Sequence, residues 1–328
     1  MERLLIIALH SVSFLSTSEK LLLLETVNTI TELVRLGKSE LEQMLGRKIR
    51  SRFTGFSDHV RKAESVLYLC SSLNIRTVCY WDHEYPPQLR EIYNPPFMLF
   101  YKGSLPAYTK PMISIVGTRK PDGLGREAAY SLGFYFAGQN IPVVSGLALG
   151  IDTEAHKGAV EYPGITIAVL GCGVDTIYPG QNKHVASQIL ENKGALISEY
   201  FPGTLPLKHR FPERNRIIAG LSRGVVVVQA PRRSGALITA DFAVEEGREV
   251  YVHKAGTDGQ VSEGSKRLLY QGAQEIYTHN DVLRDWFGEK AGASPLKLQR
   301  RYITIAQQMR EELSGRIQRK YGKVLRRT

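Results

Sequence analysis

From about residue 111 onward, short apolar runs rich in Val and Ile alternate with segments whose apolar residues recur at helical spacing. This alternation constrains the fold more than any other feature of the chain. Continuous apolar runs are typical of strands buried on both faces, and helices between them place such strands parallel in one sheet. We therefore expect a doubly wound α/β domain, with helices on both faces of a parallel sheet. The expected strands span residues 113–116, 142–144, 165–170, 195–197, 225–229, 249–252 and 275–277, and the expected helices span 126–140, 152–161, 184–192, 215–221, 236–246 and 265–271.

The sequence before this domain predicts short helices followed by a proline-rich connector. Ser16 with Glu19, and Ser39 with Glu42, are spaced as capping boxes, which mark the starts of helices. The prolines that follow disfavour helix and favour extended chain. We expect four parts: a small helical domain over 1–75, a connector over 76–110, the α/β domain over 111–288 and a basic helical tail over 289–328.

The net charge of +11 is carried mostly by this tail. Residues 289–328 hold eleven Lys and Arg against three Glu, a net +8, so the other 288 residues hold only +3. Apolar residues recur every three or four positions from Tyr302 to Tyr321, which predicts an amphipathic helix with a basic face. The sequence leaves open whether this helix packs on the body or on a second copy, contacts DNA or a partner, or lies on a membrane surface.

Several function classes are disfavoured. Cys70, Cys79 and Cys172 show no metal-ligand spacing and are typical of reduced thiols in a cytosolic protein. The apolar run over 4–9 is shorter than most secretory signal cores and stops at His10, so we expect a buried helix there. No stretch approaches the ~20 apolar residues of a membrane span, and the sequence contains no Walker A motif. We expect a cytoplasmic protein with no membrane span, no metal and no cofactor.

Four of the expected strands are followed by loops of small residues. In a doubly wound sheet, ligands bind beyond the carboxyl ends of the strands, where loops and helix N-termini present backbone N–H groups. The four loops cover residues 117–120, 145–152, 171–175 and 232–236. Their recurrence at equivalent places in one sheet predicts an anion-binding rim.

The segment around residue 211 offers binding groups rather than visible catalytic ones. Phe211 supplies a flat ring, Arg214 and Arg216 supply guanidinium groups, and Asn215 supplies an amide. These groups suit phosphates and unstacked bases. Counting the rim loops, the cations expected to face one groove are Arg119, Lys208, Arg214, Arg216, Arg232 and Arg233.

Five motifs follow one another along the α/β region. They are Gly117-Thr118-Arg119, the run over 144–152 with His156, the run over 168–175 with Tyr178 and Pro179, the run over 211–216, and the run over 234–240. Together, in this order and spacing over residues 80–280, they resemble the DprA/Smf family of DNA-processing proteins. The N-terminal residues are more weakly similar to the small helical domain, of the SAM or helix-hairpin-helix type, that many members carry.

The resemblance implies an extended Rossmann-like fold and a recombination mediator. Family members bind incoming single-stranded DNA in the cytoplasm, protect it and help load the RecA recombinase during natural transformation, usually as homodimers. Single-stranded DNA, RecA and a second copy of the chain are therefore the implied partners.

The resemblance also implies roles for individual residues. Arg119 would hold a phosphate, and Lys208 and Phe211 would supply a charge and a stacking face. The residues implied to fix the DNA backbone and a base edge are Arg214, Asn215 and Arg216. The residues implied to form the pocket floor are Ser145, Gly146, Ser234, Gly235 and Thr239.

The chain departs from the family pattern at three notable positions. Gln229 stands where members commonly carry Glu, which is expected to remove a carboxylate from the pocket edge. Lys254 lies in a segment that replaces a Val-Pro-Gly stretch, and Lys266 replaces a common Asn. These changes make the rim more basic, so Lys254 and Lys266 join the expected DNA-binding residues.

Two other functions stay open from the sequence. Phosphoribohydrolases of the lysine-decarboxylase-like group have a related fold, but Ser234-Gly235-Ala236 replaces their Pro-Gly-Gly-x-Gly-Thr loop, which disfavours hydrolysis. A nucleotide-sensing scaffold that does not bind DNA is the second alternative. The favoured prediction is a DNA-binding protein with no catalytic residues.

Overall fold

The computed structural model describes residues 2–50, 53–108, 110–162, 164–257 and 261–288, and the backbone of 317–320 and 323–326. The chain divides into two compact units, Met1–Tyr277 and Thr278–Thr328. Each unit is described by itself.

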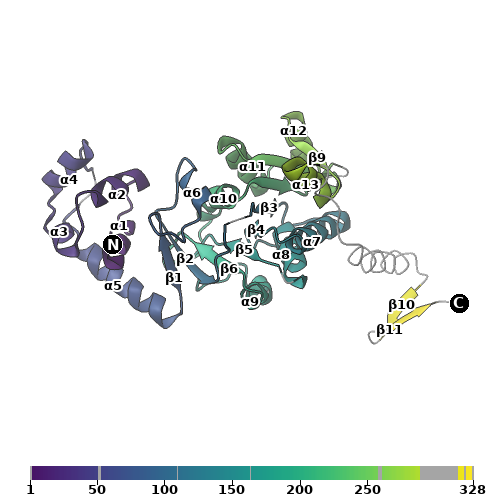
Figure 1. The fold of residues 1–328 in the computed structure, drawn as a ribbon, viewed down its shortest axis with the longest axis horizontal. Helices are drawn as coiled ribbons and strands as arrows, with labels where there is room; N and C mark the ends of the chain where they lie inside the picture. Colours follow the sequence, from purple (N-terminus) through teal and green to yellow (C-terminus); the bar gives the residue numbers. More distant parts are fainter. Residues whose placement is uncertain are drawn as a thin grey trace. The chain divides into compact units, whose positions relative to one another are not determined.

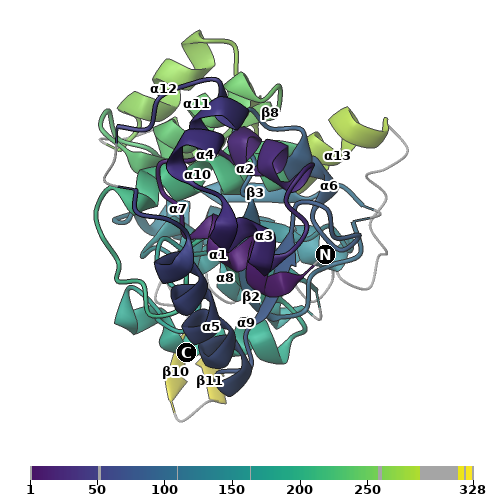
Figure 2. The same cartoon turned by 90° about the vertical axis from the view of Figure 1, so that its left-hand side faces the viewer.

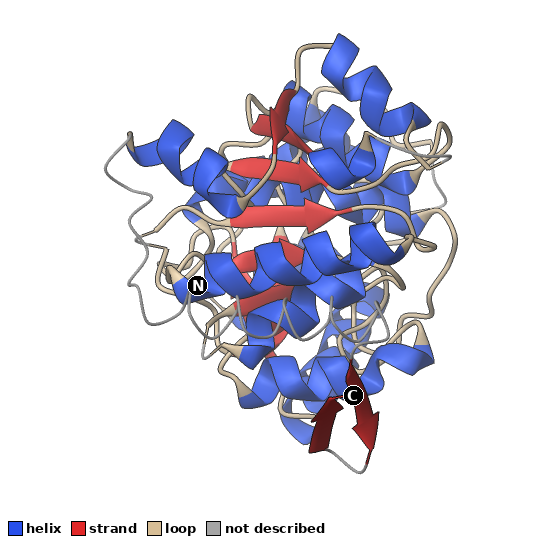
Figure 3. Cartoon of the chain, turned by 90° about the vertical axis from the view of Figure 1, so that its right-hand side faces the viewer, coloured by secondary structure: helices blue, strands red, loops and turns tan. Residues whose placement is uncertain are grey.

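A nine-stranded sheet forms the centre of the first unit (Figures 1 and 3). Its strand order is β1-β2-β6-β5-β4-β3-β7-β8-β9. The seven strands from β6 to β9 in this order are parallel, and β2 and β1 add antiparallel pairs at one edge. The strands are β1 (Arg76–Cys79), β2 (Met98–Gly103), β3 (Ile113–Val116), β4 (Val143–Ser145), β5 (Thr166–Val169), β6 (Ala195–Ser198), β7 (Gly224–Val227), β8 (Glu249–His253) and β9 (Gln274–Ile276).

Helices cover both faces of this sheet, as Figure 3 shows with blue helices in front of and behind the red strands. The elements that connect the strands are α6 (Pro87–Arg90), α7 (Gly123–Gly138), α8 (Ile151–Glu161), η1 (Gly180–Asn182), α9 (Lys183–Glu191), α10 (Arg210–Leu221), α11 (Gly235–Glu245), η2 (Lys254–Gly256) and α12 (Glu263–Tyr270). The prediction of a doubly wound α/β sheet is confirmed. Two glycines allow α7 and α8 to pack unusually closely, since a Cβ on Gly133 would overlap the backbone O of Ala155, and one on Gly158 would overlap that of Tyr130.

Five helices precede the sheet: α1 (Arg3–His10), α2 (Thr17–Leu24), α3 (Ile30–Arg35), α4 (Lys38–Leu45) and α5 (Ser57–Ser72) (Figure 2). Their buried apolar side chains form one continuous core with residues of the sheet such as Phe100 and Leu196. The buried helix expected over 4–9 is α1, whose residues Leu5 to Leu9 are all buried. The division of the chain at residue 75 stays a prediction.

One of the two expected capping boxes is confirmed and the other is wrong. Ser16 accepts a hydrogen bond from the backbone N–H of Glu19, whose carboxylate accepts one in return. The helix expected to start at Ser39 begins earlier, at Lys38, because the Glu40 carboxylate accepts a hydrogen bond from the backbone N–H of Gly37 at 2.9 Å. The sequence offered Glu40 and Glu42 as partners for a helix start, and Glu40, the earlier of the two, caps the helix.

The connector is more structured than an extended strap. It contributes β1 and β2 to the sheet edge, with α6 between them. Tyr85 is fully buried beneath it and donates its hydroxyl to the backbone O of Pro96 at 2.6 Å. These edge strands were not expected, because the flanking prolines dominate the local signal.

The second unit contains a helix and a hairpin in its described part. The helix is α13 (His279–Phe287), which begins with a capping box formed by Thr278 and Asp281. β10 (Ile317–Lys320) pairs antiparallel with β11 (Lys323–Arg326). The tail was expected to be helical throughout, and this is wrong for its last part. Two residues including Gly322 separate the strands, a spacing typical of β-hairpins. The rest of the expected tail helix lies outside the described residues.

Across the described residues, the helices are all too short or too polar to span a lipid bilayer.

Candidate nucleic-acid interface

A cavity of about 730 Å³ opens at the carboxyl ends of the central strands. From β3 the chain adds β4, β5 and β6 on one side of this strand. It then returns and adds β7, β8 and β9 on the other side, so the strand order reverses beside β3. Ligands of doubly wound sheets bind at this switch point. The loops after β3 and β7 and the first turns of α10 and α11 line the cavity. Three of the four loops expected to form the rim therefore reach the cavity, while the loop over 171–175 does not line it.

Three of the expected cations stand at the mouth of this cavity. Arg119 follows β3, Lys208 precedes α10, and Arg233 precedes α11. Their residues are exposed, and within the described part of the chain none of them forms an ion pair. Lys120 also lines the cavity and is exposed. The mouth thus presents solvated positive charges that an anion can approach without displacing a protein carboxylate.

Two aromatic rings lie side by side in the wall of the cavity. The rings of Phe211 and Tyr178 are tilted by 41° with centroids 5.5 Å apart. Gly171 lets Phe211 lie close to the backbone, since a Cβ there would come within 2.9 Å of the ring. Tyr178 is 45% exposed. Sequence reasoning placed Phe211 here but missed the ring of Tyr178. The available signal was its place, with Pro179, in one of the five motifs that carry the family resemblance, but no binding role was assigned to the ring.

Arg214 lies beneath the cavity rather than in its mouth. The residue is only 4% exposed, and its Nη1 donates to the backbone O of Gly146 at 2.9 Å and to that of Val169. Gly146 is packed against this group, because a Cβ there would lie 2.6 Å from Nη2. Desolvation lowers the pKa of Arg214 to about 10, and the charge of Asp152 opposes that shift. The guanidinium thus joins the ends of β4 and β5 under the cavity floor.

Asp152 is the one carboxylate among the described residues that line the cavity. Its Oδ2 accepts hydrogen bonds from the backbone N–H of Gly146 at 3.1 Å and of Ala148 at 3.4 Å. Burial raises its pKa, while Arg214 and these N–H groups stabilise the charged form. The carboxylate clamps the loop before α8, and no nucleophile pairs with it among the lining residues.

The expected floor residues divide into two groups. Ser234, Gly235 and Thr239 line the cavity, and Asn215 donates its amide to the backbone O of Gly235 at 3.2 Å. Ser145 and Gly146 do not line it. The Ser145 hydroxyl donates to the backbone O of Ile115 at 2.6 Å and is fully buried, so it joins β4 to β3. The structure therefore brings part of the expected floor to the cavity, while Ser145 lies in β4 and Gly146 directly after it.

Four expected cations lie away from the cavity. Arg216 extends from the opposite side of α10 and forms an ion pair with Glu199. Arg232 and Lys266 are exposed and do not line the cavity, and Lys254 lies 3.5 Å from a carboxylate oxygen of Glu275.

The family model described as DNA recombination-mediator protein A matches residues 76–287. The chain belongs to this family, the DprA/Smf proteins. It is 44% identical to the DNA processing protein DprA of Streptococcus pneumoniae over 207 residues, 62% of this chain and 72% of that protein. It is 41% identical to Protein Smf of Escherichia coli over 201 residues, 61% of this chain and 54% of that protein.

Solved structures of DprA proteins share the fold. The X-ray structure of DprA from Streptococcus pneumoniae aligns with a TM-score of 0.72 at 34% identity, over 86% of this chain and 97% of that one. A structure of DprA from Helicobacter pylori, described by its single-stranded DNA binding mode, aligns with a TM-score of 0.58 at 29% identity. It covers 64% of this chain and 96% of that one. The expected family and the extended Rossmann-like fold are confirmed.

Gln229, which departs from the DprA/Smf pattern, does not lie at the cavity edge. Its Nε2 donates to Oδ1 of Asp122 and to the backbone O of Ala255, both at 2.8 Å, and its Oε1 accepts from the N–H of Asp122 at 3.2 Å. The side chain is buried under Gly125, the third residue of α7. The amide supplies both donors and an acceptor, so it fits an environment in which a carboxylate would face Asp122.

Proposed function

We propose that this chain binds single-stranded DNA in the switch-point cavity, protects incoming strands and helps load RecA during transformation or recombination. The observation that carries the proposal is the meeting of solvated cations and two aromatic rings in one cavity. Cations neutralise phosphates, and aromatic faces stack on bases of any sequence. The Helicobacter pylori DprA structure, described by its single-stranded DNA binding mode, supports the same ligand.

Within this proposal the residues have separate roles. Arg119, Lys208 and Arg233 contact phosphates at the mouth, and Phe211 and Tyr178 stack on successive bases. Polar groups on the floor that meet a base edge or a phosphate come from Asn215, Ser234, Gly235 and Thr239. Arg232, Lys254 and Lys266 lie outside the cavity and contact phosphates of DNA strands that extend beyond it.

The remaining parts of the proposal rest on the family. The chain acts in the cytoplasm as a homodimer, with RecA as its protein partner and without a catalytic step. One observation supports the proposal that the chain has no catalytic step. Asp152, the only carboxylate among the described residues that line the cavity, accepts hydrogen bonds from two backbone N–H groups.

The test is fluorescence anisotropy of the full chain on a labelled oligothymidine and on a matched duplex across a salt series. We expect tighter binding to the single strand. Phe211→Ala should weaken it by roughly 5- to 150-fold, since stacking on one ring is worth ~1–3 kcal/mol per base. Tyr68→Ala, which removes an exposed ring on α5 far from the cavity lining, is the matched control and should bind as the parent does.

Two results would contradict the proposal. One is unchanged affinity in Phe211→Ala. The other is equal binding to single strand and duplex with a steep salt dependence, which would assign binding to diffuse positive charge such as that of residues 289–328.

A further inference from the structure

Helix α10 presents two faces to two different cavities. Phe211, Arg214 and Asn215 line the cavity proposed to bind DNA. Glu213 and Arg216 line a second cavity of about 1210 Å³. Residues three or four positions apart lie on the same side of a helix, so Phe211, Arg214 and Asn215 share one face of α10, while Glu213 and Arg216 share another. The helix is therefore a wall shared by the two cavities.

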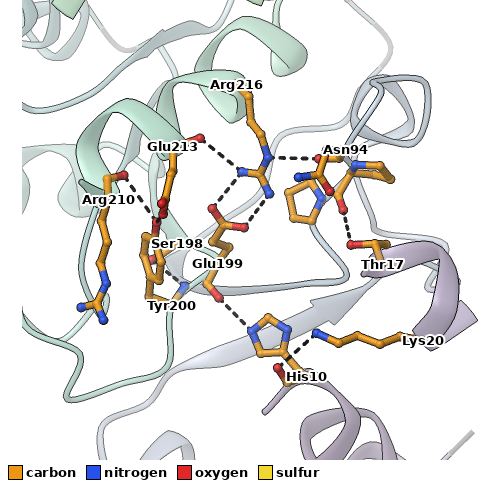
Figure 4. A network of polar contacts seen from close by, with 12 residues as sticks. His10, Thr17, Lys20, Asn94, Ser198, Glu199, Tyr200, Arg210, Glu213 and Arg216 are labelled. Atoms are coloured by element: carbon orange, nitrogen blue, oxygen red, sulfur yellow. Dashed lines mark hydrogen bonds and ion pairs between the residues drawn. The ribbon is translucent and has the colours of Figure 1, made fainter. Parts of the chain in front are cut away.

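Arg216 is held on the second side by a buried, two-pronged ion pair. Its Nη1 and Nη2 donate to the carboxylate oxygens of Glu199 at 2.8 and 2.6 Å, and its Nε donates to the backbone O of Asn94 at 3.1 Å (Figure 4). The side chains are 12% exposed for Arg216 and 17% for Glu199. Such a bidentate pair fixes the orientation of both partners, and burial limits screening by salt. It ties α10 to the end of β6 and to the connector.

The N-terminal helices are attached at the same two places. Nε2 of His10, the last residue of α1, donates to the backbone O of Glu199 at 2.9 Å. Oγ1 of Thr17, the first residue of α2, donates to the backbone O of Pro95 at 3.0 Å, next to Asn94. Figure 4 shows the His10 contact at Glu199 and the Thr17 contact beside Asn94.

His10 cannot move freely in this network. Its ring packs against Phe97, Phe100 and Phe201, with centroids 6.2, 5.9 and 4.8 Å away. The ring is partly buried and lines the second cavity, and these aromatic contacts hold it in place for its hydrogen bond to the Glu199 carbonyl. The contacts of His10 thus connect α1 to the backbone at Glu199.

We propose that Arg216 is a positioning residue that couples the N-terminal helices to the DNA cavity through α10. This inference rests on the proposed function of that cavity. It replaces the sequence-based expectation that Arg216 itself contacts DNA. The chain of contacts runs from His10 through Glu199 to Arg216, and from there along one rigid helix to Phe211.

Salt dependence separates a positioning residue from a phosphate contact. Each phosphate contact on a single strand contributes about 0.7 to the slope of log K against log salt. Arg216→Met should weaken binding of the full chain to oligothymidine by roughly 2- to 30-fold, the range of couplings carried by packed networks. Its salt slope should equal that of the parent. Arg119→Met should instead reduce the slope by about 0.7.

Controls address charge and folding. Arg61→Met removes an exposed Arg that pairs with Asp58 on the same helix, and it should alter neither affinity nor slope. Glu199→Gln keeps the size of the side chain and breaks the ion pair from the other partner, so it should reproduce the effect of Arg216→Met. If Arg216→Met fails to fold, Glu199→Gln takes its place as the test.

A double-mutant cycle tests the link to the N-terminal helices. His10→Leu should weaken DNA binding. The double variant His10→Leu/Arg216→Met should lose less binding free energy than the two single variants lose together, because both changes act through Glu199.

Each outcome decides the inference. A lower slope in Arg216→Met would mean that this residue touches a phosphate, and unchanged affinity would mean that the network does not reach the cavity; either overturns the positioning role. Additive effects of His10→Leu and Arg216→Met would overturn the link to α1. Failure of the proposed function shows differently, as a parent chain that does not prefer single strands or does not depend on Phe211.

Discussion

Replacing Arg214 by Met should destabilise the fold, whereas replacing a cation at the cavity mouth should not. Met keeps most of the length of the side chain and removes every donor. Two buried carbonyl groups, of Gly146 and Val169, then lose a donor, and the buried Asp152 carboxylate loses a stabilising cation. The change acts on stability because these groups lie inside the protein.

The magnitude follows from the contacts. An unpaired buried acceptor costs ~1–3 kcal/mol. Two such acceptors lose their donor here, and the Asp152 carboxylate also loses the attraction of a nearby cation, so we expect a total loss of about 3–5 kcal/mol in the free energy of unfolding. At ~2–4 °C per kcal/mol for a domain of this size, the melting temperature of Arg214→Met should fall by roughly 6–20 °C.

The assay is thermal unfolding followed by circular dichroism, with DNA affinity measured on the same samples well below the melting temperature. Arg233→Met is the matched control, since Arg233 is exposed at the mouth of the same cavity. It should keep its stability within about 0.5 kcal/mol and weaken DNA binding. An Arg214→Met variant that melts like the parent but no longer binds DNA would refute the buried, structural role of this guanidinium.

Two further predictions concern buried polar groups. Burial, aided by the charge of Arg214, lowers the pKa of His156 to about 3. The folded state therefore keeps this ring neutral, while the unfolded state protonates it near pH 6.5. The contribution of this residue to stability should be complete above pH 6.5 and fall as the pH drops toward 3, with a loss of about 2 kcal/mol at pH 5. Melting curves at pH 7 and pH 5 should therefore differ less for His156→Gln than for the parent, and an equal difference would argue against the neutral buried ring. Gln229→Glu should lower stability by about 1–3 kcal/mol at pH 7, because a carboxylate would replace the amide donor to Asp122 and to the Ala255 carbonyl. Its deficit should shrink at pH 5 as the new carboxyl group takes up a proton, and a deficit that grows on acidification would contradict this account.

The sheet was predictable because its signal is local and repeated. Each of these central strands is a fully buried segment made mostly of apolar residues, and a helix follows it along the chain. The edge strands β1 and β2 were not predicted, since the flanking prolines favour irregular chain locally and the place of β2 in the sheet depends on β6, about one hundred residues away in the chain. The β10–β11 hairpin was missed for a different reason, because helical and alternating patterns overlap in short basic segments.

The site was predictable in its chemistry but not in its arrangement. Arg119, Lys208 and Phe211 follow from strand ends and motif spacing, and the cavity brings them together. The burial of Arg214 has no local signal, since its partners are carbonyl groups 68 and 45 residues away. Residue type therefore identified the groups, while tertiary contacts decided which of them stay free for a ligand.

The expectation that Arg214 and Arg216 both face one groove could have been avoided from the sequence. Once the segment is a helix, Arg214 and Arg216 are about 200° apart around its axis and cannot both face one cavity. One of the two guanidinium groups therefore had to face away from the cavity, and the acidic residue after β6, Glu199, was its available partner.

The family motif on α10 therefore combines two tasks. Phe211 and Asn215 form the wall of the cavity proposed to bind DNA, while Arg214 and Arg216 fix the helix from below and from behind. A helix anchored on two sides holds an aromatic ring at a fixed angle, and such rigidity lowers the entropy lost when a base stacks on it.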